Sequence, residues 1–124
     1  MTSARAVLLV DDDPDIRDSV GDCLRDEGYE VHTAGNGQEA LDRLAVGLRP
    51  SVILLDLMMP VLNGFEVLDA LRGRPDWQGI PVVIVSANRG YEANDMHGVF
   101  DILRKPVPLE QMLETIERAV ATAA

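Results

Sequence analysis

The sequence lacks several features that define large classes of protein. It contains a single cysteine, Cys23, in 124 residues, so it cannot form an internal disulfide and does not read as a disulfide-stapled secreted domain. Its longest apolar runs are about five residues, far below the roughly 20 that a membrane-spanning helix needs. The first run is too short for a signal peptide and leads straight into Asp11-Asp12-Asp13. These absences predict a cytoplasmic protein that does not bind membranes.

Basic residues are also scarce. The chain has 11 Lys and Arg against 21 Asp and Glu, a net charge of −10, and no basic patch of the kind that binds nucleic acid. With 47% hydrophobic and 26% charged residues, it has the composition of an ordinary folded protein. Its length suits one domain with a real core. Because no linker, repeat or low-complexity segment interrupts it, we expect residues 1–124 to form a single domain.

Short apolar runs alternate with helical patterns along the chain. The runs predict strands at residues 6–10, 30–34, 52–56, 82–86 and 101–104. The helical patterns lie between Asp13-Pro14 and Gly28, at 37–45, after Asn63-Gly64, and at 108–122. The last of them places Leu109, Met112, Leu113, Ile116 and Val120 on one face. This alternation predicts an α/β fold with a parallel sheet and helices on both of its faces.

Two of the predicted strands end in carboxylates. Asp56 closes the run Val52–Leu55, and Asp11-Asp12-Asp13 follows the first strand. In an open parallel sheet, ligands bind beyond the carboxyl ends of the strands, so these acids are expected to meet there. Carboxylates 4 Å apart repel by roughly 4 kcal/mol per pair at an effective dielectric of 20. A cation must offset this repulsion, and an all-oxygen ligand set favours Mg²⁺.

Other strand ends extend the pattern, and together they resemble a known family. Strand four ends in Ser86, and strand five leads into Lys105-Pro106. The segments Leu-Val-Asp-Asp-Asp (9–13), Leu-Leu-Asp-Leu-Met-Met-Pro (54–60), Asn-Gly (63–64), Val-Ser-Ala (85–87) and Arg-Lys-Pro (104–106) resemble the receiver domain of bacterial two-component response regulators. The resemblance covers essentially the whole chain. It implies a flavodoxin-like, doubly wound sheet of five strands in the order 2-1-3-4-5.

The resemblance also implies a role for each residue at the strand ends. Asp56 would be the phosphoacceptor, attacking the phosphoryl group carried by a histidine of a sensor kinase or phosphotransfer protein. Mg²⁺ would be held by Asp12 directly, by Asp11 through water, by Asp56, and by the backbone carbonyl of Met58.

Three further implications concern the phosphoryl group and the chain around it. Lys105 would pair with a phosphate oxygen, while Ser86 and the backbone amide of Ala87 would hydrogen-bond another. The Lys105-Pro106 bond would be cis. The domain would not be an enzyme on other substrates, but would undergo self-phosphorylation from a phosphodonor and slow self-dephosphorylation.

The chain departs from the family in two places. Ile102 stands where many receivers carry an aromatic residue in strand five. Phe100 lies two residues earlier, on the same face by alternation but in the loop before the strand. The segment 86–98 is shorter than expected and weakly patterned, which predicts a short or irregular fourth helix. The usual output surface is therefore expected to be altered, and the downstream partner to be an unidentified protein.

Each residue also has a plainer interpretation. Asp11 to Asp13 could be a solvated turn in which Asp13 caps the helix, and Lys105 and Ser86 could be ordinary surface and strand-end residues. A calcium loop from Asp11 fails because Ile16 occupies the position that must be glycine. A haloacid-dehalogenase-type phosphohydrolase needs a second aspartate where Met58 stands. The alternative function is a pseudo-receiver, an interaction module that works without phosphorylation.

Overall fold

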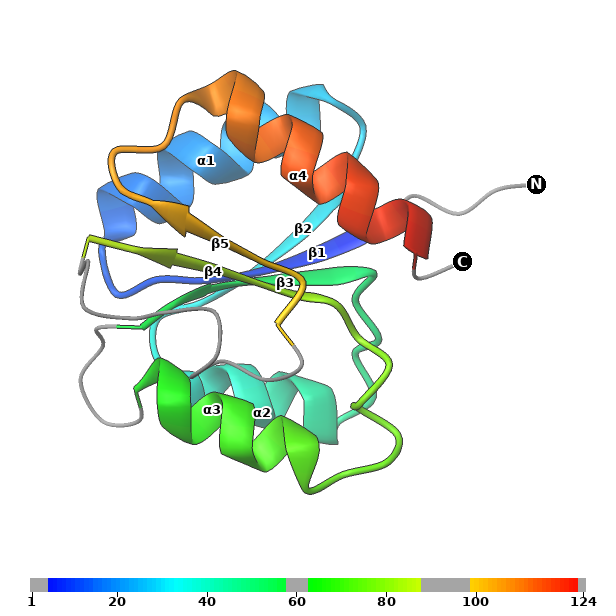
Figure 1. Cartoon of the computed structure of the whole chain (residues 1–124). Helices are drawn as coiled ribbons and strands as arrows, with labels where there is room; N and C mark the ends of the chain where they lie inside the picture. Colours follow the sequence, from blue (N-terminus) through cyan, green and yellow to red (C-terminus); the bar gives the residue numbers. More distant parts are fainter. Residues whose placement is uncertain (1–4, 58–62, 88–98, 123–124) are drawn as a thin grey trace.

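The structure, a computed structural model, describes residues 5–57, 63–87 and 99–122. Its centre is a five-stranded parallel sheet in the order β2-β1-β3-β4-β5, seen in Figure 1. The strands are β1 (Ala6–Val10), β2 (Glu30–Ala34), β3 (Val52–Asp56), β4 (Val82–Ser86) and β5 (Asp101–Arg104). The strands predicted from the apolar runs and the implied strand order are confirmed.

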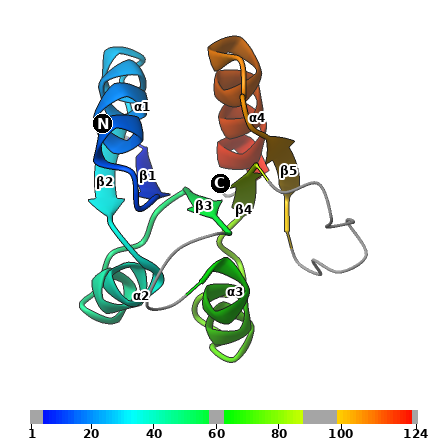
Figure 2. The same ribbon diagram turned by 90° about the vertical axis from the view of Figure 1, so that its left-hand side faces the viewer.

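Helices cover both faces of this sheet. They are α1 (Pro14–Asp26), α2 (Gly37–Ala45), α3 (Gly64–Arg72) and α4 (Leu109–Thr122). Figure 2 shows α1 and α4 on one face and α2 and α3 on the other, as the α/β pattern predicts. The segment 88–98, for which a short or irregular helix is predicted, lies outside the described residues. Within the described part of the chain, no helix is long and apolar enough to cross a membrane.

Alternate residues of each strand build two separate cores. In β1, Leu8 and Val10 belong to the core under α2 and α3, whereas Val7 and Leu9 belong to the core under α1 and α4. Every residue of β3 and β4 is buried, which is the near-continuous apolar pattern of parallel strands covered on both faces. The two cores hold the strand ends, and hence the side chains beyond them, in fixed positions.

Local capping sets where the helices begin. Asp13 is the N-cap of α1, and its side chain accepts a hydrogen bond from the Asp15 amide, as predicted. Asn63 caps α3 through a capping box, in which its side chain accepts from the Glu66 amide and Glu66 accepts from the Asn63 amide. After α1, Gly28 has a φ of 94°, the left-handed conformation that ends many helices.

Two apolar side chains depart from the pattern around them. Leu109 shares the apolar face of α4 by its spacing, but it is 45% exposed at the start of the helix, while Ile116 and Val120 are buried. Phe100 lies in the loop before β5, as predicted, but it does not share a face with Ile102: Phe100 packs against the core under α1 and α4, and Ile102 against the other core. Because β5 begins only at Asp101, strand alternation does not extend back to Phe100.

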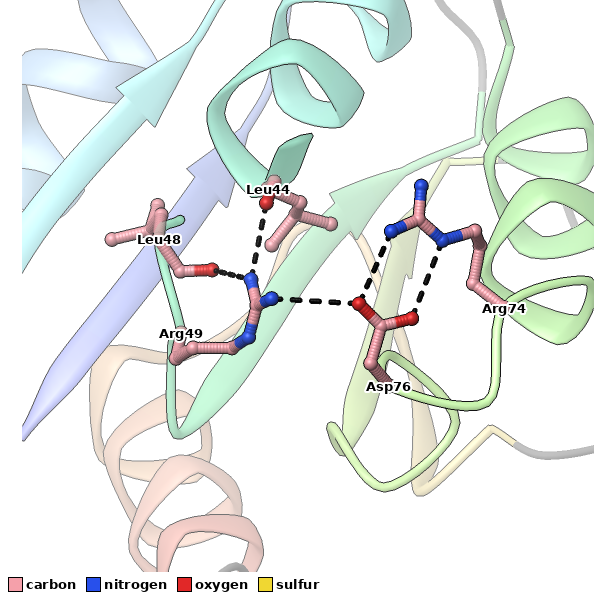
Figure 3. A network of polar contacts seen from close by, with 5 residues as sticks. All are labelled: Leu44, Leu48, Arg49, Arg74 and Asp76. Atoms are coloured by element: carbon pink, nitrogen blue, oxygen red, sulfur yellow. Dashed lines mark hydrogen bonds and ion pairs between the residues drawn. The ribbon is translucent and has the colours of Figure 1, made fainter. Parts of the chain in front are cut away.

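The loops at the opposite, amino-terminal edge of the sheet are joined by an arginine network (Figure 3). Arg49 donates to the carbonyl oxygens of Leu44 and Leu48 and to Asp76. Arg74 binds both carboxylate oxygens of Asp76, which holds the pKa of Asp76 below its usual range. The Arg74 guanidinium also lies 4.2 Å from the centre of the Trp77 ring. Trp77 is buried in the core under α2 and α3.

Candidate functional site

The carboxylates of Asp11 and Asp56 meet at the carboxyl edge of the sheet. Strands β1 and β3 are neighbours, and Val10 lies opposite Leu55, so the next residue of each strand brings Asp11 and Asp56 together. Asp11 is only 4% exposed and Asp56 only 6%. A buried carboxylate is costly unless it is paired or binds a cation, so this pair needs positive charge beside it.

Lys105 supplies part of that charge from the end of β5. Its Nζ lies 3.2 Å from Asp11 Oδ2 and 3.5 Å from Asp56 Oδ2. Burial of the ammonium group opposes its charged form, but the two carboxylates outweigh this effect and raise the pKa of Lys105 above its ordinary value. Lys105 is therefore held in its charged form between the two acids.

Asp12 completes an acidic cluster that suits a divalent cation. Carboxylate oxygens of Asp11, Asp12 and Asp56 all lie within 4.8 Å of one another, with Asp12 exposed to solvent. Three carboxylates against one ammonium leave this group with net negative charge. Mg²⁺ prefers oxygen ligands and keeps several of its own waters, so a cluster open to solvent on the Asp12 side fits it well.

Backbone and side-chain hydrogen bonds fix Asp11 in place. Its amide donates to the carbonyl of Ala34 at 3.1 Å, continuing the contact between β1 and β2. Its side-chain Oδ1 accepts from the Asp13 amide at 2.9 Å, and its carbonyl oxygen accepts from Arg17 Nη1 at 2.7 Å. The Arg17 contact was not predicted, because nothing local in the sequence joins a helix arginine to a strand-end carbonyl.

Strand β4 ends at Ser86, and Ala87 follows it beside the acidic cluster. Ser86 is 1% exposed, and its carbonyl oxygen accepts from the Lys105 amide at 2.9 Å. This bond ties the ends of β4 and β5 together and so helps to place the lysine. The Lys105-Pro106 bond is cis, as the family resemblance implies. Met58, whose carbonyl was predicted to bind Mg²⁺, lies outside the described residues, and that role stays a prediction.

Gly64 is a second residue of the site whose importance was missed. A Cβ placed on Gly64 would lie 2.8 Å from Leu57 Cα and 3.0 Å from the carbonyl oxygen of Asp56. The Gly64 amide donates to the Leu57 carbonyl at 3.0 Å. The start of α3 therefore presses directly on the end of β3. The Asn63-Gly64 pair in the sequence indicated the start of a helix. It did not indicate that this start contacts the backbone of Asp56 and Leu57.

An apolar cavity of about 480 Å³ adjoins the cluster, between α1 and α4. Asp11, Asp56 and Lys105 are its charged residues. The rest of its lining comes from the sheet, the two helices and the loop before α4: Leu9, Val10, Ile16, Val20, Leu54, Leu55, Val85, Ala87, Pro106, Val107 and Met112. The acidic cluster and Lys105 are thus open to solvent at Asp12 and bounded by apolar side chains on another side. The apolar lining lowers the effective dielectric around the charges.

The fold and the ends of its strands define a doubly wound α/β domain of the CheY-like type. The response regulator receiver domain family matches residues 7–117. The chain belongs to the response regulator receiver domain family.

Known proteins similar to the chain agree with this assignment. Response regulator MprA of Mycobacterium tuberculosis is 40% identical over 110 residues, 86% of this chain and 46% of that protein. The transcriptional regulatory protein PrrA of Mycobacterium bovis is 41% identical over 120 residues, 94% of this chain and 50% of that protein. The chain thus spans about half the length of these relatives. The chemotaxis response regulator CheY4 of Vibrio cholerae has a similar structure, with a TM-score of 0.84, 36% identity, and coverage of 94% of this chain and 99% of that one.

Proposed function

We propose that this domain is a working phosphoacceptor, which takes a phosphoryl group onto Asp56 from a phosphohistidine of a sensor histidine kinase or phosphotransfer protein. The observation that carries the proposal is the joint position of Asp11, Asp12, Asp56 and Lys105 at one sheet edge, in a chain of the receiver family. Proximity and electrostatic stabilisation are what phosphoryl transfer requires of a protein.

In the proposed transfer, an Asp56 carboxylate oxygen forms a bond to phosphorus while the bond between phosphorus and the histidine nitrogen breaks. The imidazole leaves with the electron pair of that bond and takes up a proton. Asp11, Asp12 and Asp56 would hold Mg²⁺, with the Met58 carbonyl as a further ligand. When bound, Mg²⁺ neutralises the charge that builds up on the transferring oxygens.

The remaining residues of the site would stabilise the product. The Lys105 ammonium, which already lies between Asp11 and Asp56, would bind one phosphate oxygen, and the Ser86 hydroxyl and Ala87 amide would bind another. Phosphorylation adds a charge of about −2, which shifts a pre-existing equilibrium between two surface conformations. The domain would turn over no other substrate, and its own phosphate would be lost slowly.

The proposal also covers where the domain acts and what it contacts. We place it in the cytoplasm, as one receiver domain over residues 1–124, with an unidentified protein as its downstream target. Nucleic acid is a poor candidate for that target because the net charge of −10 repels phosphate.

The test is intact-mass analysis after incubation with phosphoramidate, with and without Mg²⁺. We expect the wild type to gain one phosphoryl group only when Mg²⁺ is present, and Asp56→Asn to gain none. Asp22→Asn is the matched control, because Asp22 is an exposed acid on α1 that pairs with Arg25. A folded wild type that stays unmodified would refute the proposal and favour the pseudo-receiver alternative.

A further inference from the structure

Arg17 connects helix α1 to the backbone of the acidic cluster. It is half-buried, and its Nη1 donates to the carbonyl oxygen of Asp11 at 2.7 Å. That carbonyl belongs to the planar peptide unit that joins Asp11 to Asp12. Holding its oxygen therefore fixes the orientation of this peptide plane, from whose two Cα atoms the carboxylate side chains project.

The guanidinium group also touches the turn between β2 and α2. A Cβ placed on Gly35 would lie 3.2 Å from Arg17 Nη1 and 3.4 Å from Glu39 Oε2. Glu39 Oε2 in turn accepts from the Gly35 amide at 3.3 Å. Arg17 thus reaches from α1, past the end of β1, to the turn after β2, and it fills the space that the missing side chain of Gly35 leaves.

We propose that Arg17 is a positioning residue for the cation site: it holds the Asp11-Asp12 peptide in the orientation that lets both carboxylates serve one Mg²⁺. The inference rests on the proposed function, because it assumes that the acidic cluster binds Mg²⁺. It assigns Arg17 no contact with the phosphoryl group. Residues that orient metal ligands without touching the metal typically change affinity by 10- to 100-fold when they are replaced.

The sign of the effect separates positioning from simple electrostatics. Arg17 carries a positive charge close to a site for a cation, so losing that charge alone should tighten Mg²⁺ binding. Losing the hydrogen bond to Asp11 should loosen it, because the peptide between the two aspartates is no longer held in the orientation that directs both carboxylates to one ion. A weakened affinity after removal of a nearby positive charge therefore has no electrostatic explanation.

The experiment is calorimetric titration with Mg²⁺ of the wild type, Arg17→Met, Arg17→Lys and Arg25→Met. Arg25 is the matched control, an exposed arginine on the same helix that pairs with Asp22 at 3.4 Å. We expect Arg17→Met to weaken Mg²⁺ binding by about tenfold or more, Arg17→Lys to recover part of it, and Arg25→Met to bind as the wild type or slightly more tightly. Equal or tighter binding by Arg17→Met overturns the inference.

Gly35→Ala provides a second perturbation that keeps the arginine. Gly35 does not have a positive φ, so alanine fits the backbone, but its methyl group crowds Arg17 Nη1. We expect Gly35→Ala to weaken Mg²⁺ binding in the wild type and to have no further effect in Arg17→Met, because both changes break one contact. Two outcomes count against the positioning role of Arg17. One is that the losses of Mg²⁺ affinity from the two changes add up in the double variant. The other is that neither Gly35→Ala nor Arg17→Met weakens Mg²⁺ binding.

Phosphorylation measurements keep this inference distinct from the proposed function. At saturating Mg²⁺, Arg17→Met should be phosphorylated by phosphoramidate at a rate close to that of the wild type, while the Mg²⁺ concentration for half-maximal rate rises with the dissociation constant. If the wild type neither binds Mg²⁺ nor accepts phosphate, the proposed function and the inference both fail. If the wild type does both and Arg17→Met titrates like it, the inference alone fails.

Discussion

Replacing Gly64 with alanine tests how tightly the start of α3 supports strand β3 and Asp56 at its end. Gly64 is the first residue of α3, a position where helix propensity alone favours alanine by up to about 1 kcal/mol. The added methyl group would lie 2.7 Å from Leu57 Cδ2, 2.8 Å from Leu57 Cα and 3.0 Å from the Asp56 carbonyl oxygen. Ordinary contacts begin at 3.4 Å, and two of these three neighbours are backbone atoms that cannot move independently.

Steric crowding should outweigh the gain in propensity. Overpacking of a tight site costs about 1–3 kcal/mol. We therefore expect Gly64→Ala to lower the free energy of unfolding by about 1–2 kcal/mol after the gain in helix propensity is included. For a domain of this size that lowers Tm by about 4–8 °C. Because the crowding falls on Asp56 itself, phosphorylation by phosphoramidate should also slow. Urea unfolding and intact-mass time courses measure the two effects.

Gly73→Ala is the control for this prediction. Gly73 caps the other end of α3 with a φ of −77°, and its Cβ would meet only Ala70 and Asp69 carbonyl oxygens, at 3.5 and 3.6 Å. It should leave stability unchanged or raise it by about 0.4–1 kcal/mol, as glycine replacements do where the backbone permits. A Gly64→Ala variant that unfolds at the wild-type urea midpoint and is phosphorylated at the wild-type rate would refute the steric argument.

Three further predictions follow from the burial and charges already described. Lys105→Met should lower the free energy of unfolding by about 3 kcal/mol in EDTA, because two buried carboxylates lose their lysine. The loss should be smaller when Mg²⁺ is present, and equal losses in both buffers would contradict this. Ile116→Ala should cost about 2–5 kcal/mol, while Leu109→Ala, at a 45% exposed position, should stay within about 0.5 kcal/mol; denaturation midpoints distinguish them. Burial and then the charge of Glu117 raise the pKa of Tyr29, so the folded chain holds that proton more tightly than the unfolded chain does. The stability this supplies is complete below about pH 10 and disappears as pH rises through the folded pKa. Tyr29→Phe should remove that part of the alkaline loss in urea midpoints, and an unchanged pH profile would show that the tyrosine does not contribute.

The sheet and the residues at its carboxyl edge could be predicted because both follow from local sequence. A parallel strand that is covered on both faces must be apolar throughout, so a polar residue at its end marks the edge where ligands bind. Asp11 and Asp56 follow from this rule alone. The place of Lys105 needed the family resemblance, since a single lysine after a short strand is not distinctive.

The features that the sequence patterns did not reveal have physical causes that lie outside any local pattern. Leu109 fits the apolar face of α4, but that face only buries side chains where the sheet lies beneath it, and the first turn of α4 is exposed. The contacts of Arg17 with Asp11 and of Gly64 with Asp56 join different elements. Such contacts depend on how helices and strands pack, which periodicity and capping signals do not encode.

The separation of the site residues along the chain has a consequence for how the protein is made. Lys105 pairs with Asp11 across 94 residues, and it follows Asp56 by 49 positions. At a synthesis rate of 5–20 residues per second, a ribosome needs about 2.5–10 s to add Lys105 after Asp56. Throughout that interval the nascent chain carries Asp11 and Asp56 without the lysine that pairs with both of them. The charged cluster is therefore complete only after β5 has been made. Under the proposed function, a copy that ends before β5 would not accept a phosphoryl group from a kinase.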